Sequence, residues 1–471
     1  MLMFGTGCEV LLPFVRSVAL AHLISPTQFG LATALAVASG FAELVTDVGI
    51  HNAAMRQGGK NDSGPRALDT LHTILLVRCG LLGLVLTAIG VPLAHFFHAP
   101  EAAWSFALLG PLALLRGFMH MEVKEVMRDY VYGPDAISVV VGHVAWTVVT
   151  IGAAVVADDY RCMLYGLYAQ TLFQIVATHL VSKTRFRLGW SREIARETLI
   201  YGAPMMPNGV ALAVSGMGDR FLIGSLLGLN ALALYNVAAM AAFMPRGVVL
   251  RLLMAVAVPA FINRGIERAA STRSFDYWAI LLSVLSAFYA LSFLCFGGVL
   301  VELVFGRQYA LGQSLVSALA LSVYLKFLLS LPAPPALAFG QTRLILLSSV
   351  LAACALAGGA LAVFLTEHTL SHFILGVVAG EFLAVIWIVA RSLKLYAFAT
   401  SLTWMAVLLP IGVLAGAHYA TAAIATNDVI MRIEIFVILG AVLGLGYALI
   451  LVMHKLPIIP ALLRRRLSKP A

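Results

Sequence analysis

Apolar residues fill this 471-residue chain in fourteen long stretches that are separated by short polar turns. A helix needs about 20 apolar residues to cross the hydrocarbon core of a membrane, and each stretch is long enough to do so. The predicted helices run over residues 3–23, 29–55, 70–94, 102–119, 136–157, 162–181, 198–227, 231–259, 277–304, 312–331, 344–365, 373–390, 403–423 and 429–453. The pattern predicts an all-α, polytopic membrane protein with about fourteen transmembrane helices.

The chain also contains a duplication at a spacing of 203 residues. Residues 19–37, shifted forward by this spacing, fall on residues 222–240 in the same hydrophobic register. In both copies an apolar stretch ends, a tight turn follows, and a second apolar stretch begins. Duplicated helix bundles are typical of secondary transporters, which place a binding site between the two halves. The repeat predicts two pseudo-symmetric six-helix lobes plus two C-terminal helices, and it favours a transport function.

The longest polar connections divide this predicted bundle. Basic residues stand among the apolar residues Phe186, Leu188, Trp190 and Ile194 in the segment between the sixth and seventh stretches, so we expect it to lie on the membrane surface. The last residues of the chain are basic and should favour an anionic membrane surface. The predicted domains are residues 1–182 (N-lobe, helices 1–6), 183–197 (cytoplasmic amphipathic linker), 198–395 (C-lobe, helices 7–12), 396–455 (helices 13–14) and 456–471 (basic cytoplasmic tail).

Basic residues are distributed unevenly between the two sets of turns. The even-numbered turns and the tail hold 22 of the 31 Lys and Arg residues, whereas the odd-numbered turns hold only Arg161, Arg307 and Arg432. Lys and Arg are retained on the cytoplasmic side of short loops. We therefore expect both termini in the cytoplasm. The net charge of +9 then reflects membrane topology, and no nucleic-acid partner is expected.

Catalytic and metal-binding motifs are missing from the sequence. The five Cys residues form no CxxC pair, and the twelve His residues form no HExxH motif. Every predicted outer turn is too short to hold the acceptor site and catalytic carboxylates of a membrane sugar-transfer enzyme. The sequence thus predicts a protein that is not an enzyme, with no catalytic residues, no metal and no cofactor.

Charged residues do occur inside the predicted spans. We single out six basic and five acidic residues as intramembrane charges: Arg16, Arg78, Arg220, Arg246, Arg251 and Lys326, with Glu9, Glu43, Asp47, Asp219 and Glu381. A charge near the bilayer centre costs about 2.5 to 3.5 kcal/mol on insertion scales, so such groups usually face a cavity or a partner. This number of intramembrane charges predicts a water-filled interior.

Residues at several of the turns resemble a known family. The segments are Leu23-Ile-Ser-Pro-Thr-Gln-Phe-Gly-Leu-Ala32, Thr46-Asp-Val-Gly49, Tyr201-Gly-Ala-Pro204, Asp219-Arg-Phe-Leu-Ile-Gly224, Val304-Phe-Gly-Arg-Gln-Tyr309, Pro332-Ala-Pro-Pro335 and Gly340-Gln341. Their order and spacing resemble the bacterial polysaccharide transporter family, which includes O-antigen and exopolysaccharide flippases. That family belongs to the multidrug/oligosaccharidyl-lipid/polysaccharide exporter superfamily. The resemblance covers about residues 10–345.

The resemblance implies a flippase of the bacterial inner membrane. Such a protein moves a polyprenyl-pyrophosphate-linked oligosaccharide across the membrane by alternating access, for cell-surface polysaccharide export. Its implied partners are the lipid-linked oligosaccharide, membrane lipids, and a polysaccharide polymerase or export machinery. Two alternatives remain, namely a cation-coupled drug or small-molecule exporter of the same superfamily and an integral-membrane sugar-transfer enzyme. The six intramembrane basic residues favour an anionic substrate over a cationic drug.

A pyrophosphate head group needs cations, and the planar guanidinium of Arg binds phosphate oxygens in pairs. The candidate ligands are Arg16, Arg78, Arg220, Arg246 and Lys326. Structural ion pairs are the alternative role, particularly for Arg16 near Glu9 and for Arg220 beside Asp219.

The intramembrane acidic residues are candidates for a second role. Glu43, Asp47, Asp219 and Glu381 are predicted to couple transport to H⁺ or Na⁺ or to act in gating, and the alternative is that they are permanent partners of the cations. The repeat shift places Arg16 on Asp219 and Glu43 on Arg246. Pairing of such opposite charges on closure is a hypothesis for a gate.

Overall fold

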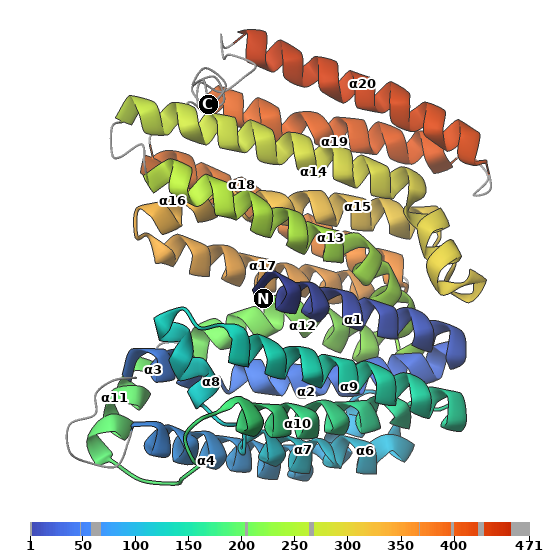
Figure 1. The fold of residues 1–471 in the computed structure, drawn as a ribbon. Coiled ribbons are helices and arrows are strands. Elements are labelled where there is room, and N and C mark those ends of the chain that lie inside the picture. The colour runs from blue at the N-terminus through green and yellow to red at the C-terminus, as the bar shows by residue number, and fades with distance from the viewer. Residues whose placement is uncertain are drawn as a thin grey trace, which may run out of the picture. The chain divides into compact units, whose positions relative to one another are not determined.

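The computed structural model describes residues 2–47, 49–57, 67–202, 206–262, 268–366, 368–396, 400–422 and 428–453. Every regular element within these ranges is a helix, which confirms the all-α prediction (Figure 1). The chain divides into two compact units, Met1–Val237 and Ala238–Ala471. The domain boundaries drawn from the sequence stay predictions.

The first unit contains the helices from the N-terminus to the start of α13. They are α1 (Leu2–Leu23), α2 (Pro26–Val45), α3 (Ile50–Gln57), α4 (Ala67–Ala88), α5 (Gly90–Phe96), α6 (Ala103–Ala107), α7 (Leu109–Arg116), α8 (Glu122–Glu125), α9 (Gly133–Ala157), α10 (Arg161–Val181), α11 (Arg192–Gly202) and α12 (Met206–Leu226). Helix α13 (Leu229–Ile262) begins in this unit and continues into the second. The second unit adds α14 (Arg268–Phe305), α15 (Gln313–Leu328), α16 (Ala333–Ala338), α17 (Thr342–Leu365), α18 (Leu370–Tyr396), α19 (Thr400–Ala422) and α20 (Val429–Met453).

All fourteen predicted stretches contain helix. Within the described residues, ten helices are long and apolar enough to cross a membrane by themselves. The count of fourteen spans therefore stays a prediction, while the multi-span membrane architecture is confirmed. Three predicted stretches are interrupted within the described residues. The stretch over residues 29–55 is divided between α2 and α3, that over residues 70–94 between α4 and α5, and that over residues 102–119 between α6 and α7.

The structure confirms the repeat in the positions of its helix ends. Helices α1 and α12 end at Leu23 and Leu226, and α2 and α13 begin at Pro26 and Leu229, so both pairs are separated by the predicted spacing. The two turns also contact each other, because the Thr27 hydroxyl donates a hydrogen bond of 2.7 Å to Asn230 Oδ1, 203 residues away. The backbones approach closely here.

Glycines allow several helix pairs to pack with their backbones in contact. In the second unit, α17 and α18 meet through Gly358 and Gly376, and a Cβ atom on either would overlap the carbonyl oxygen of the other. Close approach of this kind is typical of helix association in membranes.

We expect Gly376→Val to destabilise the protein by about 1 to 3 kcal/mol, because overpacking must push α17 and α18 apart. The change should appear as a lower melting temperature of the detergent-solubilised protein. Gly412→Val on α19 is the matched control, since nothing lies within 4 Å of the position of its Cβ atom. Equal melting temperatures for the two variants would show that α17 and α18 separate without cost.

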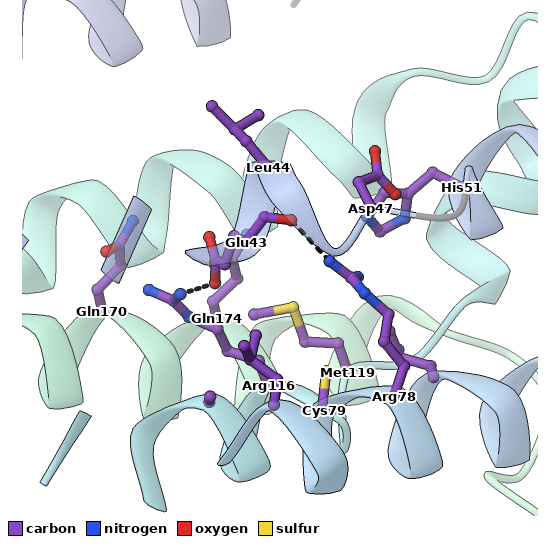
Figure 2. Close-up of a pocket in the computed structure, with 13 residues that line it drawn as sticks. Glu43, Leu44, Asp47, His51, Arg78, Cys79, Arg116, Met119, Gln170 and Gln174 are labelled. Atoms are coloured by element: carbon purple, nitrogen blue, oxygen red, sulfur yellow. Dashed lines mark hydrogen bonds and ion pairs between the residues drawn. The ribbon is translucent and has the colours of Figure 1, made fainter. Parts of the chain in front are cut away.

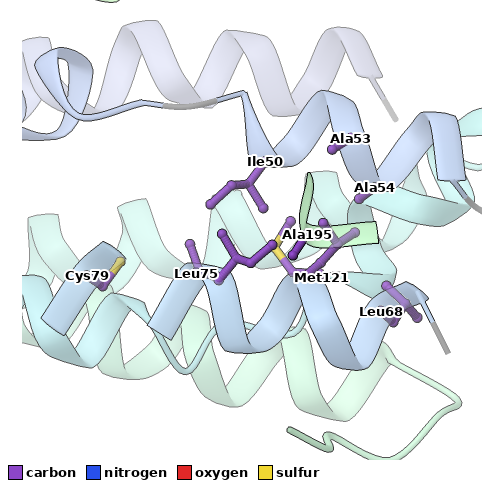
Figure 3. Close-up of a cluster of buried hydrophobic side chains, with 10 residues drawn as sticks. Ile50, Ala53, Ala54, Leu68, Leu75, Cys79, Met121 and Ala195 are labelled. Atoms are coloured by element: carbon purple, nitrogen blue, oxygen red, sulfur yellow. The ribbon is translucent and has the colours of Figure 1, made fainter. Parts of the chain in front are cut away.

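One end of the first unit is closed by apolar residues from α3, α4 and α11 (Figure 3). Ile50, Ala53 and Ala54 of α3 are buried against Leu71 and other residues of α4. Ala195 of α11 joins the same cluster. This cluster fixes the position of α3 next to the end of α2 and that of α11 next to α4.

The connection between α10 and α11, residues 182–191, has no regular secondary structure and is anchored to the first unit by hydrogen bonds. The Glu122 carboxylate accepts hydrogen bonds from the backbone N–H groups of Lys183 and Thr184 and from the Thr184 hydroxyl. Burial raises the pKa of Glu122, but the hydrogen bonds from Thr184 and Lys183 outweigh it and hold that pKa below its ordinary value. Farther along, Thr73 Oγ1 donates to the carbonyl oxygen of Gly189 at 2.8 Å. These hydrogen bonds hold the segment that the sequence predicted on the membrane surface against α4 and α8.

Candidate functional site

A polar pocket of about 310 Å³ lies within the first unit, among helices α2, α3, α4, α7 and α10 (Figure 2). Its charged and polar lining residues are Glu43, Asp47, His51, Arg78, Arg116, Gln170 and Gln174. Helices α2 and α4 are among the candidate membrane spans. Polar groups at such a location are costly and usually mark a substrate or ion pathway.

An ion pair between Arg116 and Glu43 crosses this pocket from α7 to α2 (Figure 2). The Arg116 side chain is 15% exposed and that of Glu43 is 40% exposed. Arg116 also donates to Ser39 Oγ, one turn earlier on α2, at 3.3 Å. Because Glu43 retains contact with the pocket, a ligand or a proton can reach its carboxylate without unfolding the site.

Arg78 occupies the other side of the pocket and holds the end of α2 (Figure 2). Its Nε donates to the carbonyl oxygen of Thr46 at 2.7 Å, and its Nη2 donates to that of Glu43 at 2.8 Å. The last carbonyl groups of a helix lack partners within the helix, and a cation there also complements the helix dipole. This contact caps the end of α2, which stops at Val45 within a stretch that the hydrophobic pattern predicted to continue.

Two glutamines of α10 complete the polar wall. Gln170 and Gln174 are four residues apart, so they share one face of the helix. Each amide offers donors and an acceptor, which suits the hydroxyl groups of sugars. The pocket thus combines guanidinium groups that can bind an anion with amides that can bind a glycan.

Three other predicted residues of the first unit lie outside this pocket. Arg16 of α1 is 5% exposed and stacks on the ring of Trp146 at 3.5 Å from its centroid. Asp219 accepts a hydrogen bond from the Tyr235 hydroxyl, and Arg220 Nη1 lies 3.5 Å from Asp219 Oδ1. The Asp219–Arg220 pair therefore has the structural contact that the sequence offered as an alternative.

The remaining predicted residues form a cluster in the second unit. Lys326 Nζ on α15 lies 3.3 Å from Glu381 Oε1 on α18, and Ser322 Oγ donates to Glu381 Oε2 at 2.8 Å. Arg246 Nη2 on α13 donates to the carbonyl oxygen of Lys326 at 2.7 Å and to Ser330 Oγ at 3.2 Å. Glu381 is thus a buried carboxylate with a cation and a hydroxyl as partners.

Of the nine residues predicted for the site, the pocket contains Arg78, Glu43 and Asp47. The pairing of Glu43 with Arg246 joins different units and stays a prediction. Sequence reasoning missed Arg116, which was counted with the basic residues around the cytoplasmic end of the stretch over residues 102–119. It also missed Gln170 and Gln174, because only charged residues were sought. Amide side chains four residues apart within an apolar stretch were the available signal.

Two solved structures share the fold of this chain. The lipid II flippase MurJ, in an inward closed conformation, aligns with a TM-score of 0.70 and 9% identity over 94% of this chain and 97% of that chain. A multidrug resistance MATE family transporter of the MOP superfamily, in an inward-facing conformation, aligns with a TM-score of 0.63 and 16% identity over 83% of this chain and 94% of that chain. The chain therefore shares the fold of these two membrane proteins.

The sequence comparisons define the family. Residues 19–311 match the family described as "Polysaccharide biosynthesis protein", and the chain belongs to that family. The succinoglycan biosynthesis transport protein ExoT of Rhizobium meliloti (strain 1021) is 24% identical over 317 residues. This match covers 66% of the present chain and 62% of the relative.

Proposed function

We propose that this protein is a flippase that translocates a polyprenyl-pyrophosphate-linked oligosaccharide across the bacterial inner membrane. Transport occurs by alternating access and serves cell-surface polysaccharide export. The observation that carries the proposal is the polar pocket among the helices of the first unit, where Arg78 and Arg116 lie beside two amides. Family membership and the transport protein from Rhizobium meliloti support it further.

The pocket suggests how Arg116 can serve both Glu43 and the substrate. Glu43 holds Arg116 in this structure. The oxygens of the pyrophosphate are anionic acceptors, which a guanidinium binds more strongly than neutral ones, so the substrate can displace Glu43 from Arg116. Departure of the pyrophosphate lets the ion pair form again. Arg116 therefore acts in substrate binding, and Glu43 acts in gating.

The function is tested with spheroplasts in which the lipid-linked oligosaccharide has been labelled biosynthetically. An impermeant glycan-oxidising reagent modifies only molecules that have reached the outer leaflet. We expect modification to require the intact protein and to be lost with Arg116→Ala. Unchanged modification in cells that lack the protein would contradict the proposal. Restored export of a cationic dye without glycan modification would instead support the drug exporter that the sequence left as an alternative.

A further inference from the structure

An apolar groove lies next to the polar pocket in the first unit. Its volume is about 460 Å³, which is in the range of ligand sites. Apart from Thr46 and Arg78, the residues that line it are apolar. One wall is a single face of α4, because its lining residues recur every three or four positions along the helix. The other wall includes Leu199 of α11 and Met206 of α12.

The groove is long enough to hold a chain. On α4 it runs from Ile74 to Val85. Eleven residues of α-helix correspond to about 16 Å, which is roughly half of the hydrocarbon core. Val77, Leu81 and Val85 are each more than half exposed, so their surfaces are available to a ligand.

One end of the groove is formed by Trp190, which is 59% exposed. The residues on both sides of it are fixed, because Gly189 is bonded to Thr73 and the N–H of Ser191 donates to Thr70 Oγ1 at 3.0 Å. Trp is enriched where membrane and water meet, since its ring is apolar and its N–H is polar. The anchored connection between α10 and α11 thus places a rigid aromatic group at the end of an apolar channel.

Exposed apolar residues on a membrane helix normally contact bulk lipid, and Leu84 of α4 is an example at 72% exposed. The groove differs because Arg78 and Leu82 line both it and the polar pocket. A cation therefore stands where the polar and apolar cavities meet. The ligand that fits this arrangement has an anionic polar head joined to a long apolar chain.

We propose that the groove holds the polyprenyl chain of the substrate while its pyrophosphate and glycan occupy the polar pocket. This inference rests on the proposed function and assigns its lipid part to a face of α4, α11 and α12. Arg78 then has two roles, since it ends α2 and marks the junction between head group and chain.

The test uses the full chain in lipid nanodiscs and a polyprenyl pyrophosphate that carries a photoreactive group on its chain. Cross-linked peptides are identified by mass spectrometry. We expect labelling of the groove face of α4 that is displaced by unlabelled polyprenyl pyrophosphate and not by the same concentration of phosphatidylglycerol. Leu81→Trp should fill the groove and lower this labelling about tenfold, the change produced by about 1.4 kcal/mol.

Leu84→Trp is the matched control, because Leu84 lies on the same helix and does not line the groove. Its labelling should stay within about twofold of the unmodified protein. Val85→Trp serves as a second filling variant if Leu81→Trp elutes as an aggregate. It replaces a groove residue that is 54% exposed.

The possible outcomes distinguish a failure of the groove assignment from a failure of the proposed function. Displaceable labelling confined to other helices would overturn the groove and leave the proposed function standing. Displacement by phosphatidylglycerol would identify the groove as a general acyl-chain site and overturn the assignment. No displaceable labelling at any position would count against the proposed function itself.

Discussion

Replacing Lys326 by alanine is expected to destabilise the second unit severely. Its ammonium group lies 3.3 Å from Glu381, whose side chain is 3% exposed. Loss of one partner of a buried ion pair leaves an uncompensated charge, which costs about 3 to 5 kcal/mol. The loss should appear as a large fall in the melting temperature of the detergent-solubilised protein and as reduced amounts of protein in the membrane.

Two comparisons make this result specific. Lys326→Met combined with Glu381→Leu removes both charges and should recover most of the stability, since an apolar pair of similar volume replaces a buried ion pair at little cost. Arg307→Ala breaks the pair between Arg307 and Glu302, in which the Arg307 side chain is 94% exposed. An exposed pair contributes about 0 to 1 kcal/mol. If Lys326→Ala melts no lower than Arg307→Ala, the buried pair does not stabilise the unit.

The double variant also tests whether the Lys326–Glu381 pair acts in transport. If Lys326 binds substrate or Glu381 couples transport, a stable protein that lacks both residues should export no glycan. A pair that only stabilises the fold should be dispensable in the same variant. The glycan-oxidation assay distinguishes the two, because stability is held nearly constant.

The helices and the repeat were predictable because the membrane imposes them. Backbone groups in hydrocarbon must be satisfied within a helix, so an apolar stretch specifies both the element and its approximate length. The turns after Leu23 and Leu226 could be located for the same reason. The hydrophobic pattern did not locate the end of α2 at Val45, where Arg78 of α4, 33 residues later in the chain, bonds the carbonyl oxygen of Thr46. A periodicity contains no information about such a contact.

The site was predicted only in part, since the pattern gives the depth of a residue and not the direction in which it faces. Arg78 and Arg16 were assigned the same role on the basis of depth. The structure places Arg78 in the polar pocket and Arg16 against Trp146. Arg116 was missed for the converse reason. It lies at the end of α7, and the ion pair with Glu43 places it in the pocket.

Glycan export should fall by at least about tenfold when Glu43 is replaced by arginine. The change removes the partner of Arg116 and adds a third guanidinium to a pocket that already contains Arg78. Like charges placed side by side repel each other, and about 1.4 kcal/mol of repulsion corresponds to a factor of ten. Export is measured by glycan oxidation at the outer leaflet. Glu101→Arg, at an exposed turn outside the pocket, is the control for the change of charge.

The double reversal identifies the partner of Glu43. With Arg116→Glu added to Glu43→Arg, an ion pair of opposite polarity can form across the pocket, so we expect a substantial part of the export to return. Adding Arg246→Glu instead tests the gate that the repeat predicted, and recovery then requires Arg246 to leave its bonds to the carbonyl oxygen of Lys326 and to Ser330. Recovery with Arg246→Glu and not with Arg116→Glu would reverse this conclusion. It would show that the working partner of Glu43 is the residue that the repeat predicted for a gate.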